Sequence, residues 1–299
     1  MTAPLQALAS TEHLATRAMP RLSSQEMLKI GRAEVDRLVK SLASEADQVK
    51  KTELFHSWLA TLSRFWRYSH WNQVFILLAC PRARWVGPRS LWTELGRTVR
   101  PGEEPIIILA PSRRQGPRYF IAVEVFDVSQ TEGAPLPEPS WVVTGGSPIL
   151  EAVERAARRL EIRVEDVACD GTFLGRTLGR HHIQMASGLS PAERAATLIH
   201  ECAHALLHTL DLPRKRRPMT PLSQVDREIQ AEGVAYVVLR ATGQPSTAPT
   251  YLAVNFDASA SSSRIRASLR DIARASREIL RVMAGVRTQC PKRTKVRAQ

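Results

Sequence analysis

The sequence contains only four cysteines among 299 residues, and their positions follow no repeated spacing. This pattern excludes the small secreted proteins that depend on a disulfide framework. Long hydrophobic runs are also lacking, because the longest notable run, residues 74–80, is far shorter than the roughly 20 apolar residues that span a membrane. Residues 1–20 lack the basic start and apolar block of a secretory signal. We therefore expect a cytoplasmic protein without a membrane partner.

Acidic residues are too few to balance the basic ones, and the net charge is +13 at pH 7. The excess lies mainly in two stretches. Residues 58–118 hold ten arginines against three acidic residues, and residues 264–299 hold eleven basic against two acidic residues. Basic blocks of this kind suit a polyanion, most often nucleic acid. A solvated surface that only aids solubility explains the charge about equally well.

The chain is organised around residues 197–208, which contain the sequence His200-Glu201-Cys202-Ala203-His204. A helix is predicted here, because alanine, leucine and isoleucine recur at helical spacing up to residue 207. Residues 190–193, Ser-Pro-Ala-Glu, give its start, with a serine cap, proline in the first turn and glutamate three residues after the cap.

Two histidines four residues apart share one face of a helix, so His200 and His204 can hold one metal ion between them. A zinc site made of two imidazoles and one carboxylate leaves a fourth position for water and lowers the pKa of that water to roughly 7. Glu201 is then placed to take a proton from the water as it attacks a carbonyl. We predict Zn²⁺, or another divalent metal, at the histidines and Glu201 as the catalytic base.

A third ligand is predicted on a later helix, residues 225–238, where Glu228 and Glu232 lie four residues apart. We assign Glu228 as the ligand and Glu232 as the carboxylate that orients a ligand histidine through its ring N–H, although the reverse order is also open. Short motifs of this type also arise by chance. Here the flanking residues are apolar, and buried charged groups need a partner, which favours a metal site.

Five of the six tryptophans fall between residues 58 and 92, with arginines between them. Bases of single-stranded DNA stack on aromatic rings at about 1–3 kcal/mol each, and arginines follow the phosphates. Some of these tryptophans must instead fill a core: we expect this of Trp58, Trp66 and Trp92. The residues predicted to contact single-stranded DNA are Arg64, Arg67, Trp71, Arg82, Arg84, Trp85, Arg89, Arg97 and Arg100.

Residues 129–147, rich in proline, glycine and serine, are the clearest predicted linker. The fold class we predict is α+β: a small α+β domain that binds single-stranded DNA, then a mainly helical, zincin-like metallopeptidase domain with a short sheet. The two domains span residues 23–128 and 148–285, between a disordered tail (1–22) and a basic tail (286–299). Helices are predicted at about 24–42, 51–67, 71–80, 148–160, 190–207, 225–238 and 264–283. Strands are predicted at 84–86, 105–110 and 118–128, with one or two more within 161–185.

The motifs together resemble the ArdC-type antirestriction proteins, which join an N-terminal domain for single-stranded DNA to a C-terminal metallopeptidase domain related to the ImmA/IrrE group. The N-terminal resemblance is carried by residues 71–73, 84–87, 92–97, 99–103 and 108–111. The C-terminal resemblance is carried by residues 189–194, 200–208 and 228–238, and the whole match covers about 24–285.

The resemblance implies metal ligation by His200, His204 and Glu228, with Glu201 as the base, and DNA binding through the first domain. Gln230 stands where this family often has another glutamate, which favours Glu228 as the ligand. The basic segment 213–218 is longer and more charged than the family pattern.

Three functions remain open at this stage. The first is a zinc-dependent peptidase that binds single-stranded DNA and acts on an unidentified protein. The second is a protein that coats incoming single-stranded DNA, with a metal that only holds the fold. The third is an ImmA-like protease that cleaves a regulator without contacting DNA. Tyr236, four residues after Glu232, is a candidate partner for the oxyanion of a peptidase.

Overall fold

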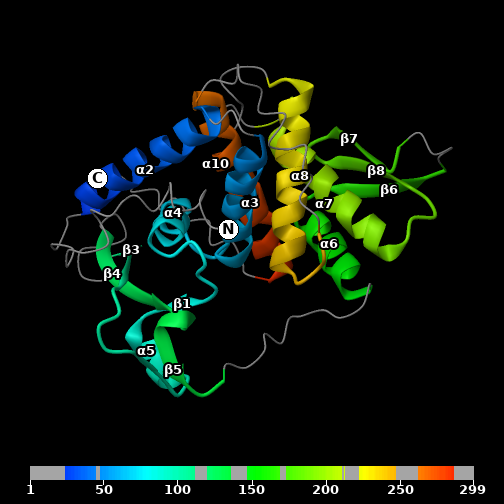
Figure 1. Cartoon of the computed structure of the whole chain (residues 1–299). Coiled ribbons are helices and arrows are strands. Elements are labelled where there is room, and N and C mark those ends of the chain that lie inside the picture. The colour runs from blue at the N-terminus through cyan, green and yellow to red at the C-terminus, as the bar shows by residue number, and fades with distance from the viewer. Residues whose placement is uncertain are drawn as a thin grey trace, which may run out of the picture.

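The structure is a computed structural model, and it describes residues 24–44, 48–111, 120–135, 147–168, 173–210, 212, 222–246 and 262–285. The two predicted tails and the basic segment 213–218 lie outside these residues. Helices dominate and the sheets are small, so the fold is α+β as predicted (Figure 1). No helix of the described ranges is long and apolar enough to cross a membrane.

Three helices begin the described chain: α2 (Ser24–Ser44), α3 (Gln48–Arg64) and α4 (His70–Ala79). All three were predicted, and their ends shift by up to three residues. Helix α4 begins at a cap, because the Ser69 side chain accepts a hydrogen bond from the Asn72 N–H at 3.3 Å. It ends before Pro81, which cannot continue a helix.

A three-stranded antiparallel sheet follows, in the order β1-β4-β3. Its strands are β1 (Val86–Gly87), β3 (Ile106–Pro111) and β4 (Phe120–Asp127). The predicted pairing of the two long strands is confirmed. Strand β1 begins two residues later than predicted, because the N–H groups of Arg84 and Trp85 bond the Asp127 side chain instead of a neighbouring strand.

A second sheet pairs β2 (Arg97–Val99) with β5 (Thr131–Gly133), and α5 (Arg89–Glu94) precedes it. Neither strand is among the predicted ones, and the second lies within the predicted linker, residues 129–147. A short 3₁₀ helix, η1 (Val128–Gln130), joins β4 to β5. The two paired strands lie more than thirty residues apart in sequence, so the local pattern of neither strand indicates the pairing.

The described residues of the C-terminal half form a three-stranded sheet and four helices. The helices are α6 (Ser147–Arg159), α7 (Pro191–Leu207), α8 (Gln224–Ala241) and α10 (Ser262–Met283). The strands are β6 (Arg163–Val167), β7 (Gly175–Gly179) and β8 (His182–Ala186). The order is β6-β8-β7, with β6 parallel and β7 antiparallel to β8. Among the described strands β7 therefore lies at an edge of this sheet.

One hydrophobic core joins the two halves of the chain. It contains Leu42 and Leu59 from the first two helices together with Leu198, Val237 and Ile272 from α7, α8 and α10, all at most 1% exposed. Figure 1 shows α8, in yellow, between α3 and α7, and α8 is in contact with both. Helices that precede the predicted linker thus pack directly on helices that follow it. The domain boundaries themselves stay a prediction.

Candidate metal centre and active site

Helix α7 forms as its sequence predicts. Ser190 Oγ accepts the Glu193 N–H at 3.3 Å, and Glu193 Oε2 accepts the Ser190 N–H at 3.1 Å, so a capping box closes its first turn. Leu198 and Cys202 face the core, and burial raises the pKa of the Cys202 thiol to about 12. Cys202 therefore packs as a neutral side chain, and the opposite face of α7 lines a cavity of about 870 Å³.

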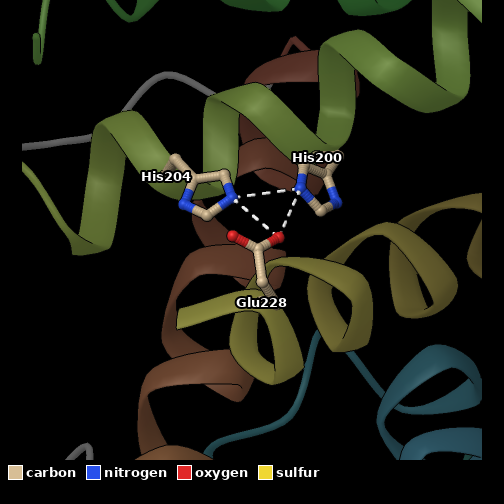
Figure 2. Close-up of side chains that lie close together, drawn as sticks. All are labelled: His200, His204 and Glu228. Atoms are coloured by element: carbon tan, nitrogen blue, oxygen red, sulfur yellow. Dashed lines mark hydrogen bonds and ion pairs between the residues drawn. The ribbon is translucent and has the colours of Figure 1, made fainter. Parts of the chain in front are cut away.

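The three predicted ligands converge in this cavity. His200 Nε2 and His204 Nε2 lie 3.0 Å apart, and Glu228 Oε2 lies 3.3 Å from the first and 3.5 Å from the second (Figure 2). Two ligand atoms at about 2.0–2.1 Å from a tetrahedral ion lie roughly 3.3 Å apart. The spacing and the chemistry of these donors, two imidazoles and a carboxylate, both fit a divalent cation such as zinc.

The charges of His200 and Glu228 support each other. Burial alone lowers the pKa of His200, but its contacts with Glu228 and Glu232 outweigh burial and raise the pKa to about 9. Hydrogen bonds from His200 and His204 hold the pKa of the Glu228 carboxyl well below its usual range. Glu228 is therefore an anion at neutral pH, which is the state a metal ligand requires.

Glu232 lies on the other side of the His200 ring, one turn beyond Glu228 on α8. Its Oε1 is 3.3 Å from His200 Nδ1, whereas the converging atom of the ring is Nε2. An acceptor at Nδ1 would keep the proton on that nitrogen when a metal replaces the proton of Nε2. This is the orienting position that the spacing of the two glutamates predicts.

Glu201 is 7% exposed and lines the same cavity. Thr177 Oγ1, on β7, lies 2.7 Å from Glu201 Oε2 and 2.9 Å from its backbone carbonyl oxygen, so the hydroxyl can donate to either. The backbone of β7 approaches closely at Gly175, where an added Cβ would lie 2.9 Å from Glu201 Cγ. Thr177 was not among the predicted site residues, because the strands within residues 161–185 could not be located in detail from the sequence.

A chain of hydrogen bonds orients the His204 ring through its Nδ1 atom. His208 Nδ1 lies 2.9 Å from His204 Nδ1, His208 Nε2 lies 3.0 Å from Gln230 Oε1, and Gln230 Nε2 donates to Ser268 Oγ at 2.9 Å. The last bond turns the amide oxygen toward His208, whose Nε2–H therefore donates and whose Nδ1 accepts from His204. Burial lowers the pKa of His208 to about 4, which keeps its ring neutral.

This chain leaves the lone pair of His204 Nε2 directed at the converging atoms. Gln230 is completely buried, and the sequence analysis assigned it no role of its own. The sequence did contain a signal for the His208 end of this chain, because His208 follows His204 by four residues and shares its helix face.

The family model of the IrrE N-terminal-like domain, Peptidase_M78, matches residues 161–245. The matched segment runs from β6 to the end of α8 and contains all three candidate ligands and Glu201. Residues 161–245 are therefore similar to this metallopeptidase-like domain.

Two solved structures of the antirestriction protein ArdC from the R388 plasmid are similar to most of the chain, one metal-free and one with Mn(II) bound. Each is 18% identical, and the match covers 86% of this chain and 99% of the ArdC chain, with TM-scores of 0.46 and 0.49. ArdC is the family that the sequence motifs resemble. No curated protein matches the chain.

Several residues predicted to contact DNA bind the protein itself. Arg64 donates to the backbone carbonyl of Ala83 at 2.7 Å. Arg97 donates to Thr131 Oγ1 at 2.8 Å and to backbone carbonyls of β5, and Arg100 donates to Ser129 O at 2.7 Å. These arginines join segments that lie far apart in sequence, and local charge patterning does not reveal such partners.

The other predicted DNA residues differ in exposure. Arg82 and Arg84 are exposed beside the half-buried Trp85, whose ring contacts the buried Trp92 edge-on. The Arg89 guanidinium lies over the Phe126 ring, 4.3 Å from its centroid. Arg67 is exposed and lies over the Trp66 ring at 5.3 Å, whereas Trp71 is half-buried against the core. Contact of any of these residues with DNA stays a prediction.

Proposed function

We propose that this protein is an ArdC-type antirestriction protein: a protein that binds single-stranded DNA and carries a zinc-dependent peptidase. The observation that carries the peptidase proposal is the convergence of two imidazole nitrogens and a carboxylate oxygen, all within 4.8 Å of one another, in a cavity that also contains Glu201. The antirestriction proposal is supported by the ArdC-type motifs in both halves of the sequence.

A divalent cation held by His200, His204 and Glu228 would polarise a peptide carbonyl and make water acidic enough to attack it. Glu201 accepts the proton of that water and passes it to the leaving amine. Because the Thr177 hydroxyl is within bonding distance of Glu201 Oε2, we assign the proton transfer to Oε1. Tyr236 lines the cavity one turn beyond Glu232, and we assign its hydroxyl to the oxyanion.

The substrate we propose is a peptide segment in extended conformation. Strand β7 has β8 as its one neighbour among the described strands, so its other edge can pair with an added strand through backbone hydrogen bonds. Residues 173–177, in and just before β7, line the cavity together with His200 and Glu201. A peptide on this edge would bring its carbonyl groups past the catalytic residues, and Leu174, 55% exposed, would contact an apolar side chain.

Single-stranded DNA is proposed to bind the N-terminal half around Arg82, Arg84 and Trp85. Two exposed arginines beside an accessible indole ring can hold phosphates and stack a base. The affinity should fall steeply when salt rises from 50 to about 200 mM, because phosphate contacts release counterions. Binding that is insensitive to salt would exclude contacts of these arginines with DNA phosphates. It would favour the alternative of a protease that does not contact DNA.

The deciding variant is Glu201→Gln, which keeps the shape of the side chain and its contact with Thr177. Glu165→Gln, on β6 outside the cavity, is the matched control. We expect Glu201→Gln to keep the metal and the DNA affinity but to lose protection of incoming DNA in a restricting host, while the control keeps all three. Protection that survives in Glu201→Gln would refute the peptidase and favour a DNA-coating protein.

Metal analysis of the purified protein tests the cofactor directly, with zinc and manganese measured together. His200→Ala should lose the metal on dialysis. His181→Ala is the control, because His181 is exposed and bonds the Glu161 carbonyl oxygen at 2.8 Å. Equal metal content in the wild type and both variants would show that the ion binds elsewhere.

A further inference from the structure

A second cavity, of about 340 Å³, lies between the beginning of α4 and one face of α10. Helix α10 supplies four arginines, spaced three or four residues apart so that they share a face: Arg270, Arg274, Arg277 and Arg281. Helix α4 supplies His70 and Gln73. These residues belong to the second basic stretch of the sequence and to the motif around Trp71, and they take no part in the metal centre.

Three side chains of this cavity have polar atoms that are buried without a hydrogen-bond partner. Gln73 is 4% exposed; its Nε2 donates to the Phe65 carbonyl at 3.0 Å, but its Oε1 has no partner. The same holds for His70 Nδ1 and Arg274 Nη1. They are three of the six such atoms in the described residues, and all three lie at this one cavity. Unpartnered buried groups are costly, so their clustering points to a ligand.

The charge of the cavity defines the ligand as an anion. Asp271 lies 3.7 Å from Arg270 and 3.4 Å from Arg274, and Glu278 is the one acidic residue of the lining. Burial and the nearby Arg281 lower the pKa of Arg277 to about 10. Burial, Arg277 and Arg270 lower the pKa of His70 to about 4. Burial is the first cause of both shifts, and the neighbouring arginines add to it.

The donors are also held in place. Arg277 Nε donates to the Trp66 carbonyl at 3.1 Å, and its Nη2 lies 3.4 Å from the Arg67 carbonyl oxygen, so the guanidinium is fixed at the cavity wall. His70 is the first residue of α4, and the N-terminal end of a helix attracts negative charge. Gln73 Oε1 adds an acceptor, which an anion with a hydroxyl group close to its charge can satisfy.

We propose that this cavity binds a phosphate monoester on a sugar, the group shared by a nucleoside 5′-monophosphate and the 5′-phosphorylated end of a DNA strand. The arginines and the start of α4 would hold the phosphate, and Gln73 would accept a hydrogen bond from a protonated phosphate oxygen or a sugar hydroxyl. A volume of about 340 Å³ is at the lower end of small-ligand sites and suits one nucleotide. The proposal does not depend on the metal centre.

The test compares binding of four probes by the full chain: inorganic phosphate, thymidine 5′-monophosphate, and one oligothymidine with either a 5′-phosphate or a 5′-hydroxyl end. The two oligonucleotides differ only at the end, so binding through phosphodiesters elsewhere on the protein cancels in their comparison. We expect the 5′-phosphate to raise affinity about tenfold or more. If only thymidine 5′-monophosphate binds more tightly than inorganic phosphate, the cavity is assigned to free nucleotides. If only the 5′-phosphorylated oligothymidine binds more tightly than its 5′-hydroxyl form, the cavity is assigned to DNA ends.

The diagnostic variant is Arg274→Gln, and Arg266→Gln is its matched control. Both remove one positive charge from α10, but Arg266 pairs with Asp36 at 2.6 Å and does not line the cavity. Arg274→Gln should abolish the gain from the 5′-phosphate, and Arg266→Gln should preserve it, with unchanged thermal unfolding as the check on the fold. Absence of binding to all phosphate monoesters, or equal losses in both variants, would overturn the proposal.

Discussion

The carboxylate of Asp127 provides the most direct quantitative test of the N-terminal half. Asp127 is completely buried at the end of β4 and accepts four hydrogen bonds. Its Oδ1 accepts the N–H groups of Arg84 at 2.7 Å and Trp85 at 3.0 Å. Its Oδ2 accepts the N–H of Ser129 at 3.0 Å and its hydroxyl at 2.6 Å. The Asp127 side chain thus connects η1 to Arg84 and Trp85, which we propose to contact DNA.

The change Asp127→Asn should lower the free energy of unfolding by about 2–4 kcal/mol. The amide oxygen of asparagine can replace Oδ1, but its NH₂ group then faces the Ser129 N–H and leaves that donor unpaired. The remaining bonds also lose the contribution of the charge. If the whole chain unfolds cooperatively, an unfolding entropy of about 2.1 cal/mol/K per residue converts this loss into a decrease in Tm of roughly 3–6 °C.

The pH dependence gives a second readout of the same change. Burial alone raises the pKa of Asp127, but hydrogen bonds from Ser129, Trp85 and Arg84 outweigh it and hold the pKa below its usual value. A group whose pKa is lower in the folded state stabilises the fold fully above its unfolded pKa, which is about 3.9 for aspartate. That stabilisation is lost as the pH falls through the pKa of the folded state. The difference in the free energy of unfolding between wild type and variant should therefore be largest at pH 7 and decrease below about pH 4.

Thermal unfolding followed by circular dichroism measures both effects. Asp36→Asn is the control, since Asp36 forms a half-exposed ion pair with Arg266 that contributes about 0–1 kcal/mol. A decrease in Tm at pH 7 that is no larger for Asp127→Asn than for the control would refute the reasoning.

Two further changes test the metal centre and the strand beside it. Gln230→Leu should weaken metal affinity about 10–100-fold, measured by competition with a chelator, because it breaks the hydrogen-bond chain that orients His204; unchanged affinity would show that the chain does not position the ligand. Gly175→Ala should lower stability to urea by about 1–3 kcal/mol, because its Cβ would lie 2.9 Å from Glu201 Cγ. Gly179→Ala, where nothing lies within 4 Å of the added atom, is the control on the same strand, and equal effects of the two would contradict the crowding argument.

The grouping of the candidate ligands could be predicted from the sequence because helical spacing is a local property, while their role as metal ligands stays a prediction. His200 and His204 share a face by their i and i+4 positions, and the same rule relates Glu228 to Glu232. The residues that flank both motifs are apolar, which indicated that the histidine face of one helix and the glutamate face of the other are turned into the protein. The capping box at the start of α7 was equally local, and the structure contains it as predicted.

The hydrogen-bond partners of Glu201 and Arg97 could not be predicted, because they depend on pairing between distant segments. Thr177 reaches Glu201 only since β7 pairs with β8 and crosses α7. Arg97 carries the same charge as a DNA-binding arginine, yet it donates to β5, more than thirty residues later in sequence. Composition and spacing indicate how many arginines a segment holds, but not which of them are already bound to a backbone carbonyl.

Helix α8 links the metal centre to the rest of the chain. Its apolar residues do not form one face, a pattern typical of a helix covered on most sides, and α7, α3 and α10 all pack on it. At Gly233 an added Cβ would lie 2.8 Å from Ile272 Cδ1, so α10 approaches α8 as closely as a glycine permits. Both α3 and α10 lie outside residues 161–245, the part that matches the peptidase family. The positions of Glu228 and Glu232 are therefore fixed by packing that the matched segment does not contain, and the N-terminal half contributes to the geometry of the site through α3.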